Sequence, residues 1–185
     1  MIVRTVELYT DGACKDNQSK DNVGGYGGVL HFRGHEKEFS GGVKNSTNNI
    51  MELTAVIEGL KAIHDRDLRV EIYTDSAYIV NCFKEKWYVD WIKRGWKTSA
   101  RKPVENRALW EELLALVDEF AEVVFYKIKG HLLPGAKDYD KWYNKFRQEE
   151  KEVSLEVFKR YISYNHRADE LASDAALKAG EYDKE

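Results

Sequence analysis

The chain has 185 residues, of which 43% are hydrophobic and 33% charged, a balance typical of a folded globular protein rather than a disordered one. This length corresponds to one domain, so we expect residues 1–185 to fold as a single unit. No apolar run reaches the ~18 residues that a membrane span needs, and the N-terminus lacks the pattern of a secretion signal. Two cysteines are too few for a disulfide framework or a Cys-based zinc site. We therefore expect a cytoplasmic protein with reduced thiols and no membrane partner.

The first part of the chain predicts three strands and one helix. β-branched and aromatic residues predict a strand over 2–10, and a polar loop over 12–22 follows it. A glycine-rich strand over 24–32 and an extended run over 36–39 then predict a hairpin. The glycines indicate either β-bulges or a neighbouring element that approaches closely. Apolar residues at helical spacing predict a helix over 50–64.

The second part of the chain alternates strands and helices. We place strands at 70–74 and 123–126, and helices at 76–83, 109–117 and 168–178, with a frayed tail over 180–185. Hairpin strands come first and strand–helix units follow, a pattern typical of an α/β fold with a mixed sheet. We expect helices to flank this sheet.

Positive charge is concentrated in one segment, residues 84–107, called the handle below. It contains eight Lys and Arg residues against three acidic ones, although the whole chain has a net charge of −3. Four of the five tryptophans lie in this segment or just after it. Two interpretations remain open: an electrostatic surface for a polyanion, or an amphipathic helix pair with tryptophans in its small core.

The sequence Tyr-Thr-Asp occurs twice, ending at Asp11 and at Asp75, and each copy follows a predicted strand. If these strands are parallel neighbours, both carboxylates lie side by side at the edge where sites form in open α/β sheets. The alternative is that each Asp only forms a turn or caps a helix. The duplicated context favours a function.

Two further carboxylates, Glu52 and Asp169, lie at the starts of predicted helices, where either could simply stabilise the helix end. Taken together, however, four carboxylates are enough ligands for two hard divalent cations, Mg²⁺ or Mn²⁺ rather than zinc. Two such ions activate water and stabilise the leaving oxygen in phosphodiester cleavage. Without metal, the cluster would repel itself and raise its own pKa values.

At this point the chain resembles a known family, type 1 ribonuclease H. The matching motifs occur in the family's order: Tyr9–Cys14, Thr47–Leu53, Thr74–Ser76, Lys129–His131 and Ala168–Ala172, with Lys93–Thr98 resembling the family's basic handle. The resemblance implies a ribonuclease H-like fold with a mixed five-stranded sheet. It also implies that Asp11, Glu52, Asp75 and Asp169 are metal ligands, and that His131 assists proton transfer or product release.

The same resemblance implies a substrate, the RNA strand of an RNA–DNA hybrid, cut endonucleolytically to leave 5′-phosphate and 3′-hydroxyl ends. The implied substrate-binding residues are Asn17, Thr47, Asn48, Asn49 and Trp87, together with Lys93, Arg94, Trp96 and Lys97 of the handle. Contacts to the 2′-hydroxyl restrict cutting to RNA, whereas handle contacts to phosphates carry no sequence information. The first loop lacks the family's prolines, so Asn22 remains an alternative to Asn17. We expect a monomer.

Two alternatives of other classes remain: a DNA-acting nuclease of the same fold, and a non-catalytic module that binds hybrids. The handle and Thr47-Asn48-Asn49 favour hybrids over DNA, and the presence of all four carboxylates argues against a non-catalytic module.

The chain departs from the family at residues 132–164, called the insertion below, which separate His131 from Asp169 where compact relatives have a short loop. Aromatic and apolar residues at helical spacing predict two short helices in it. Its seven basic and six acidic residues do not mark it as a nucleic-acid arm. The simpler interpretation is a helical hairpin packed on the domain. The alternative is that it reaches over the active site and contacts substrate or steadies His131.

Overall fold

A computed structural model of the chain describes residues 4–15 and 22–181. It contains one mixed five-stranded sheet in the order β3-β2-β1-β4-β5, as predicted for this fold class. The strands are β1 (Thr5–Lys15), β2 (Val23–Phe32), β3 (His35–Lys44), β4 (Arg69–Thr74) and β5 (Glu122–Lys127). The helices are α1 (Asn48–Lys61), α2 (Ala77–Lys84), α3 (Trp87–Lys93), α4 (Arg107–Glu119), α5 (Tyr139–Glu149) and α6 (Leu155–Glu181). Within the described ranges, no helix is both long and apolar enough to cross a membrane.

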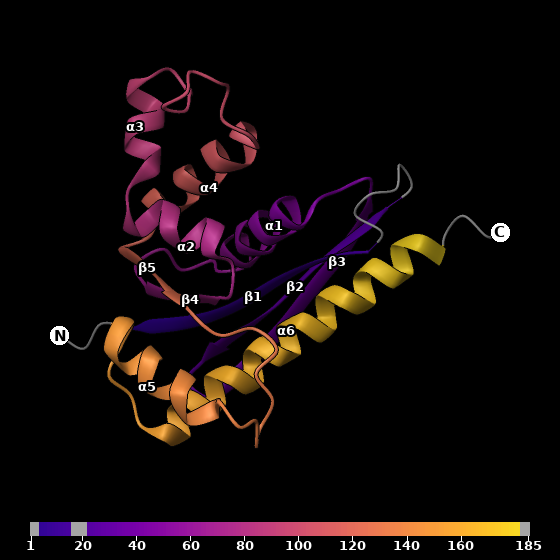
Figure 1. Cartoon of the computed structure of the whole chain (residues 1–185), viewed down its shortest axis with the longest axis vertical. Coiled ribbons are helices and arrows are strands. Elements are labelled where there is room, and N and C mark those ends of the chain that lie inside the picture. The colour runs from indigo at the N-terminus through magenta and orange to yellow at the C-terminus, as the bar shows by residue number, and fades with distance from the viewer. Residues whose placement is uncertain (1–3, 16–21, 182–185) are drawn as a thin grey trace.

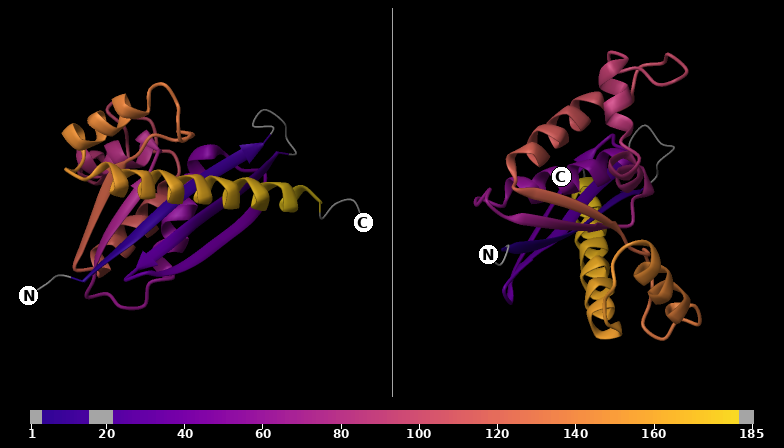
Figure 2. Two further views of the ribbon diagram at one scale, coloured as in Figure 1. Left: turned by 90° about the horizontal axis from the view of Figure 1, so that it is seen from below. Right: turned by 90° about the vertical axis from the view of Figure 1, so that its left-hand side faces the viewer.

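Helices cover both faces of the sheet (Figures 1 and 2). On one face, α1, α2 and α4 enclose a core of aliphatic residues around the fully buried Trp110. On the other face, α6 and α5 enclose a second core that is rich in aromatic rings, including Tyr9, Tyr73, Phe158 and Tyr161. Each strand of the central pair therefore buries side chains on both faces, as expected for parallel strands inside an α/β fold.

Strand β1 is longer than predicted. It continues through Asp11 to Lys15, where the sequence suggested a loop from Gly12 onward, because these residues pair with the glycine-rich start of β2. The glycines of β2 mark a close neighbour: a Cβ at Gly25 would lie 2.1 Å from the Ala172 carbonyl oxygen of α6. The absence of side chains lets α6 lie directly on the sheet.

Helix α6 corrects the prediction for the C-terminal part of the chain. The sequence suggested a short second helix in the insertion and a separate final helix beginning near Asp169, but one unbroken 27-residue helix contains both. No Gly or Pro interrupts 155–179, and buried residues such as Phe158, Ile162 and Ala172 continue at helical spacing. Asp169 is therefore inside a helix and caps nothing, and residues 180 and 181, predicted to fray, still belong to α6.

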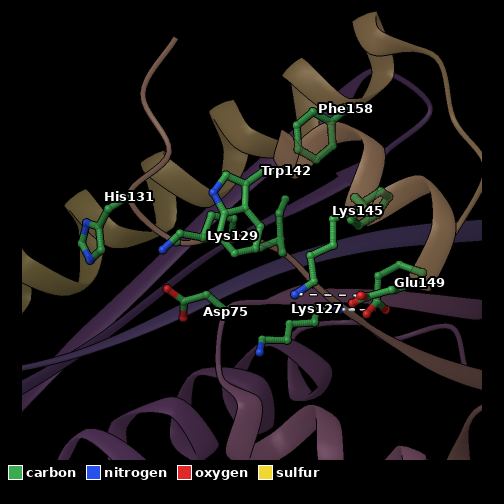
Figure 3. A pocket seen from close by; sticks show the side chains of 12 residues that line it. Asp75, Lys127, Lys129, His131, Trp142, Lys145, Glu149 and Phe158 are labelled. Atoms are coloured by element: carbon green, nitrogen blue, oxygen red, sulfur yellow. Dashed lines mark hydrogen bonds and ion pairs between the residues drawn. The ribbon is translucent and has the colours of Figure 1, made fainter. Parts of the chain in front are cut away.

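The insertion forms α5 and the first turns of α6, so it packs on the sheet beside β4 and β5. Two ion pairs hold it there: Lys151 Nζ lies 2.6 Å from Glu71 Oε2 of β4, and Arg160 Nη2 lies 2.8 Å from Glu7 Oε1 of β1. Figure 3 shows that Trp142 and Lys145 of α5 face the segment that carries Lys129. The insertion thus adds a surface close to the end of β5.

The handle comprises α3 and the turns that join it to α2 and α4. Its tryptophans pack against one another, with Trp91 5.5 Å from Trp110 and 6.2 Å from Trp96 between ring centroids. Its basic side chains at Lys93, Arg94 and Lys97 are exposed. The segment therefore has the small tryptophan core of the second interpretation, and its basic residues are exposed, while a role in binding a polyanion stays a prediction.

Candidate active site

The register of two parallel strands brings Asp11 and Asp75 together. Tyr9 of β1 pairs with Tyr73 of β4, so each aspartate lies two residues beyond the same register position. Asp11 is buried in the continuation of β1, and Asp75 directly follows β4. The two Tyr-Thr-Asp segments are thus parallel neighbours, as their shared pattern predicted.

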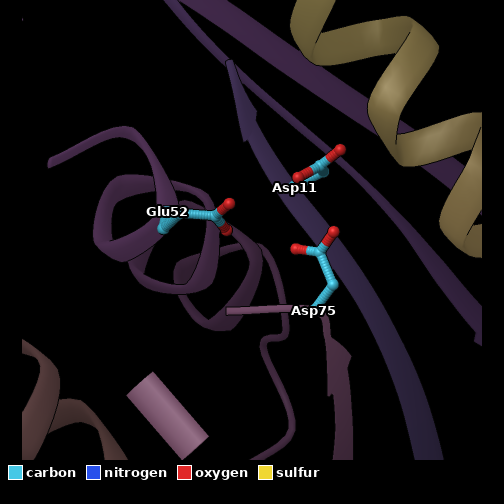
Figure 4. A group of neighbouring side chains, drawn as sticks. All are labelled: Asp11, Glu52 and Asp75. Carbon is cyan, nitrogen blue, oxygen red and sulfur yellow. The ribbon is translucent and has the colours of Figure 1, made fainter. Parts of the chain in front are cut away.

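Helix α1 supplies the third carboxylate. Thr47 caps this helix by accepting a hydrogen bond from the Ile50 N–H at 3.2 Å, which sets where the first turn begins. Glu52 lies close to that turn with its side chain buried toward the sheet. One carboxylate oxygen from each of Asp11, Glu52 and Asp75 lies within 4.8 Å of the other two. Figure 4 shows the three carboxylates pointing toward one another.

This arrangement is electrostatically costly without a cation. Burial, the charge of Asp75 and the nearby Asp169 raise the pKa of Asp11 to about 8. Burial and the charges of Asp11 and Asp75 raise the pKa of Glu52 as well. Glu52 Oε2 is buried and accepts no hydrogen bond from the described residues. An unpaired buried oxygen among repelling carboxylates fits a hard divalent cation, since these oxygens are the ligands such a cation prefers.

Asp169 and His131 complete the cluster from the other side. Asp169 is not within the group of three, but it lines the same open cavity of about 550 Å³ as Asp11, Glu52 and Asp75. His131 also lines this cavity, and its Nδ1 lies 3.6 Å from Asp169 Oδ2. The His131 side chain is 76% exposed, so it is free to reach solvent or a ligand. All five residues predicted to be catalytic therefore share one cavity.

Gly130 sets how closely the loop after β5 approaches Asp75. A Cβ at this position would lie 1.9 Å from Asp75 Oδ2. Burial raises the pKa of Asp75, while the charges of His131 and Lys129 on this loop oppose the shift. The loop therefore contributes positive charge next to the carboxylates, and only a glycine allows it to come so near.

The predicted substrate-binding residues fall into three groups. Asn48 and Asn49 at the start of α1 are exposed and line the carboxylate cavity. Thr47 is exposed beside them, with its hydroxyl used in the helix cap. Asn17 lies outside the described residues, while its alternative Asn22 is buried and accepts a hydrogen bond from the Ser46 N–H at 2.8 Å.

The third group lies on the handle, away from the carboxylate cavity. Lys93, Arg94 and Lys97 are exposed there, and Trp87 is half-buried with its Nε1–H donating to Glu85 Oε2 at 2.7 Å. Trp96 packs against Trp91, and the Arg107 guanidinium lies 5.3 Å from its ring centroid. Trp96 therefore packs inside the handle and stabilises it, whereas the basic residues of the handle face solvent.

Sequence reasoning gave no role to two residues near the carboxylates. Ser173 lines the cavity one helical turn after Asp169, and the i+4 spacing on a helix was the signal that could have found it. Lys129 lies on the loop after β5, and its charge opposes the rise in the pKa of Asp75. No sequence pattern revealed this proximity, because it depends on how the loop folds.

Comparison with known proteins agrees with this geometry. The sequence model of the RNase H family matches residues 4–177. The chain is 43% identical to ribonuclease H of Clostridium botulinum over 129 residues, which cover 70% of this chain and 85% of that one. It is 50% identical to ribonuclease HI of Neisseria meningitidis over 128 residues, which cover 69% and 84%.

Among solved structures, LC9-RNase H1, described as a type 1 RNase H with the type 2 active-site motif, is similar with a TM-score of 0.68 and 28% identity. The likeness covers 97% of this chain and 75% of that one. The expected resemblance is confirmed by a family match over most of the chain and by these relatives. The chain therefore belongs to the ribonuclease H family and is an endonuclease that hydrolyses phosphodiester bonds.

Proposed function

We propose that the protein hydrolyses the RNA strand of RNA–DNA hybrids with two divalent cations, Mg²⁺ in the first instance and Mn²⁺ as a substitute. The products would carry 5′-phosphate and 3′-hydroxyl ends. One observation carries this proposal: four carboxylates and a histidine from separate parts of the chain line one open cavity. Family membership supports the RNA-strand specificity.

In this proposal Asp11, Glu52, Asp75 and Asp169 hold the cations. When bound, the cations neutralise charge on the scissile phosphate and activate the attacking water. The buried position of Asp11 and Glu52 fixes their carboxylates before substrate arrives, so little reorganisation is needed during the reaction. Phosphoryl transfer needs mainly this positioning and charge neutralisation from the protein.

In this proposal His131 takes part in proton transfer. Its exposed imidazole lies beside Asp169, at the open side of the cavity, and an imidazole nitrogen can accept or donate a proton. It can take a proton from the attacking water or give one to the leaving oxygen. By pairing with Asp169, it would also weaken the hold of that carboxylate on a cation, which would help the product to leave.

In this proposal two surfaces bind the substrate and together determine its class. Asn48 and Asn49 line the cavity, and in this proposal they hydrogen-bond groups in the minor groove, where only RNA offers a 2′-hydroxyl. The exposed lysines and arginine of the handle bind phosphates without reading sequence. A hybrid that contacts both surfaces presents its RNA strand to the carboxylates.

The test is a cleavage assay with four labelled substrates: the hybrid, single-stranded RNA, duplex RNA and duplex DNA, each with and without Mg²⁺. We expect Mg²⁺-dependent cleavage within the RNA strand of the hybrid. End analysis should find 5′-phosphate and 3′-hydroxyl termini. Preferred cleavage of duplex DNA would favour the DNA-acting alternative, and binding of the hybrid without cleavage would leave only a binding module.

A further inference from the structure

A second cavity adjoins the carboxylates and is built largely by the insertion. It has a volume of about 310 Å³ and lies between the end of β5, the loop at 129–131 and helix α5. Asp75 and His131 line both this cavity and the carboxylate cavity. The two are therefore continuous at this edge of the sheet, and we call the second one the α5 groove (Figure 3).

Trp142 lines the α5 groove, and lysine side chains lie around its ring. Three ammonium groups lie near its ring, with Nζ to centroid distances of 5.3 Å for Lys129, 5.8 Å for Lys141 and 5.2 Å for Lys145. The indole N–H donates to Asp138 Oδ2 at 2.7 Å, which fixes the orientation of the ring. Each of these cation–π contacts is attractive, so the ring favours these positions of the lysine side chains.

Besides Asp75 at its mouth, two acidic residues line the groove, and each has a lysine partner. Glu149 lies 3.9 Å from Lys145 Nζ in an exposed pair, a geometry that contributes little. Glu150 is paired with Lys84 Nζ at 2.6 Å and accepts from the Lys127 N–H at 3.1 Å. Lys129 and Lys145 line the groove, so an anion placed there would be attracted to both ammonium groups.

We propose that the α5 groove binds phosphates of the RNA strand next to the scissile linkage, so that the insertion extends the substrate-binding surface. This inference rests on the proposed function. Asp75 and His131 line both cavities, so a strand whose linkage lies at the carboxylates is next to the mouth of the groove. Exposed lysines provide the non-specific phosphate contacts that nucleic-acid binding requires.

The position of the groove relative to the handle supports this role. The handle and α5 lie on opposite sides of the sheet, in Figure 1 and in the right-hand view of Figure 2. The carboxylates lie at the edge between them. A hybrid held by the handle on one side would thus gain a second set of phosphate contacts on the other side. The balanced overall charge of the insertion gives no sign of this surface, to which helix α5 contributes Lys145 as well as Glu149.

The first experiment neutralises the two insertion lysines that lie beside the Trp142 ring, in the double variant Lys141→Gln/Lys145→Gln. The matched control is Lys137→Gln/Lys159→Gln, which removes the same charge from exposed insertion residues that neither line the groove nor lie beside this ring. We expect KM for a hybrid to rise about tenfold at low salt in the groove variant, with kcat changed less than about twofold. The slope of log affinity against log salt should fall by about 0.9 for each phosphate that the variant no longer binds.

The second experiment locates the contact on the substrate. Hybrids carry a single neutral methylphosphonate linkage, moved step by step along the RNA strand or along the DNA strand. For the wild-type protein, one or two RNA positions beside the cleavage site should weaken binding when neutralised. The groove variant should be insensitive at those same positions, because the interacting pair is already broken.

The outcomes separate this inference from the proposed function. Equal KM and equal salt slopes in groove variant and control would overturn the groove, even if hybrid cleavage itself is normal. Sensitive positions found only in the DNA strand would overturn the assignment to RNA. If the wild-type protein does not cut hybrids, the proposed function fails, and direct binding of the same methylphosphonate hybrids still decides whether the groove holds RNA phosphates.

Discussion

Tyr9 and Tyr73 occupy the same register position on neighbouring parallel strands, and their rings stack with centroids 5.0 Å apart. Tyr126 of β5 continues the row, 5.3 Å from Tyr73. A slip of one residue between β1 and β4 would turn these rings out of the aromatic core. The same register carries Asp11 and Asp75 to adjacent positions, so the packing of the tyrosines and the geometry of the carboxylates depend on one alignment.

The first prediction concerns Asp75→Asn. This variant should lose more than about 100-fold in cleavage activity, because a ligand carboxylate is gone. Its metal-free stability should equal or exceed that of the wild type, by about 1 kcal/mol or a Tm rise of about 2–4 °C, because one repelling charge is removed. A cleavage assay checks the loss of activity, and calorimetry with and without Mg²⁺ checks the stability. The stabilisation that Mg²⁺ gives the wild type should disappear in the variant.

The exposed Asp118 of α4 offers a charge-matched control, since Asp118→Asn removes a carboxylate far from the cavity. That variant should keep activity and its response to Mg²⁺. A clear fall in Tm for Asp75→Asn alone would show that Asp75 stabilises the fold and would contradict a repelling cluster.

The second prediction concerns Gly130→Ala. The added methyl group would meet Asp75 Oδ2, so this carboxylate has to rotate away from Asp11 and Glu52. We expect the Mg²⁺ concentration at half-maximal activity to rise about 10- to 100-fold with little loss of stability. Gly180→Ala is the control, because its nearest side-chain atom, in Val23, lies at an ordinary 3.5 Å. An unchanged Mg²⁺ requirement would show that Asp75 does not depend on this close approach.

The paired aspartates could be predicted from the sequence because two identical tripeptides that each follow a strand meet if the two strands are parallel neighbours. The unbroken helix α6 was missed because its two halves were assigned separately, although no residue breaks 155–179. The grouping of Lys129 with Lys141 and Lys145 could not be predicted. It depends on how α5 packs against the end of β5, a tertiary relationship without a sequence period.

The third prediction concerns the handle. Replacing Lys93, Arg94 and Lys97 with Gln should weaken hybrid binding for every sequence and lower the salt slope by about 0.9 for each phosphate that is no longer neutralised. Binding measured across a salt series checks this. The control removes the same charge from exposed Lys37, Lys159 and Lys178. A salt slope equal to that of the control would mean that the handle does not contact phosphate.

The fourth prediction concerns Lys151→Met, which breaks the main tether of the insertion. Glu71 is 8% exposed and accepts hydrogen bonds from Lys151 Nζ at 2.6 Å and from the Tyr73 hydroxyl at 2.8 Å. Burial alone raises the pKa of Glu71, but these hydrogen bonds outweigh burial and hold the pKa below its usual range. Because Lys151 is partly exposed, we expect a loss of about 1–3 kcal/mol in unfolding free energy at pH 7.

The pH dependence separates this ion pair from simple packing. A carboxyl group whose pKa is lowered by folding stabilises the protein above its unfolded pKa, and this stabilisation is lost as the pH falls through the lower folded value. The difference in unfolding free energy between wild type and Lys151→Met should therefore shrink from pH 7 to pH 3, as measured by urea denaturation. The double variant Glu71→Gln/Lys151→Met should show little of this pH dependence. A difference that stays constant over the whole range would mean that Lys151 holds the insertion through its methylene chain and not through its charge.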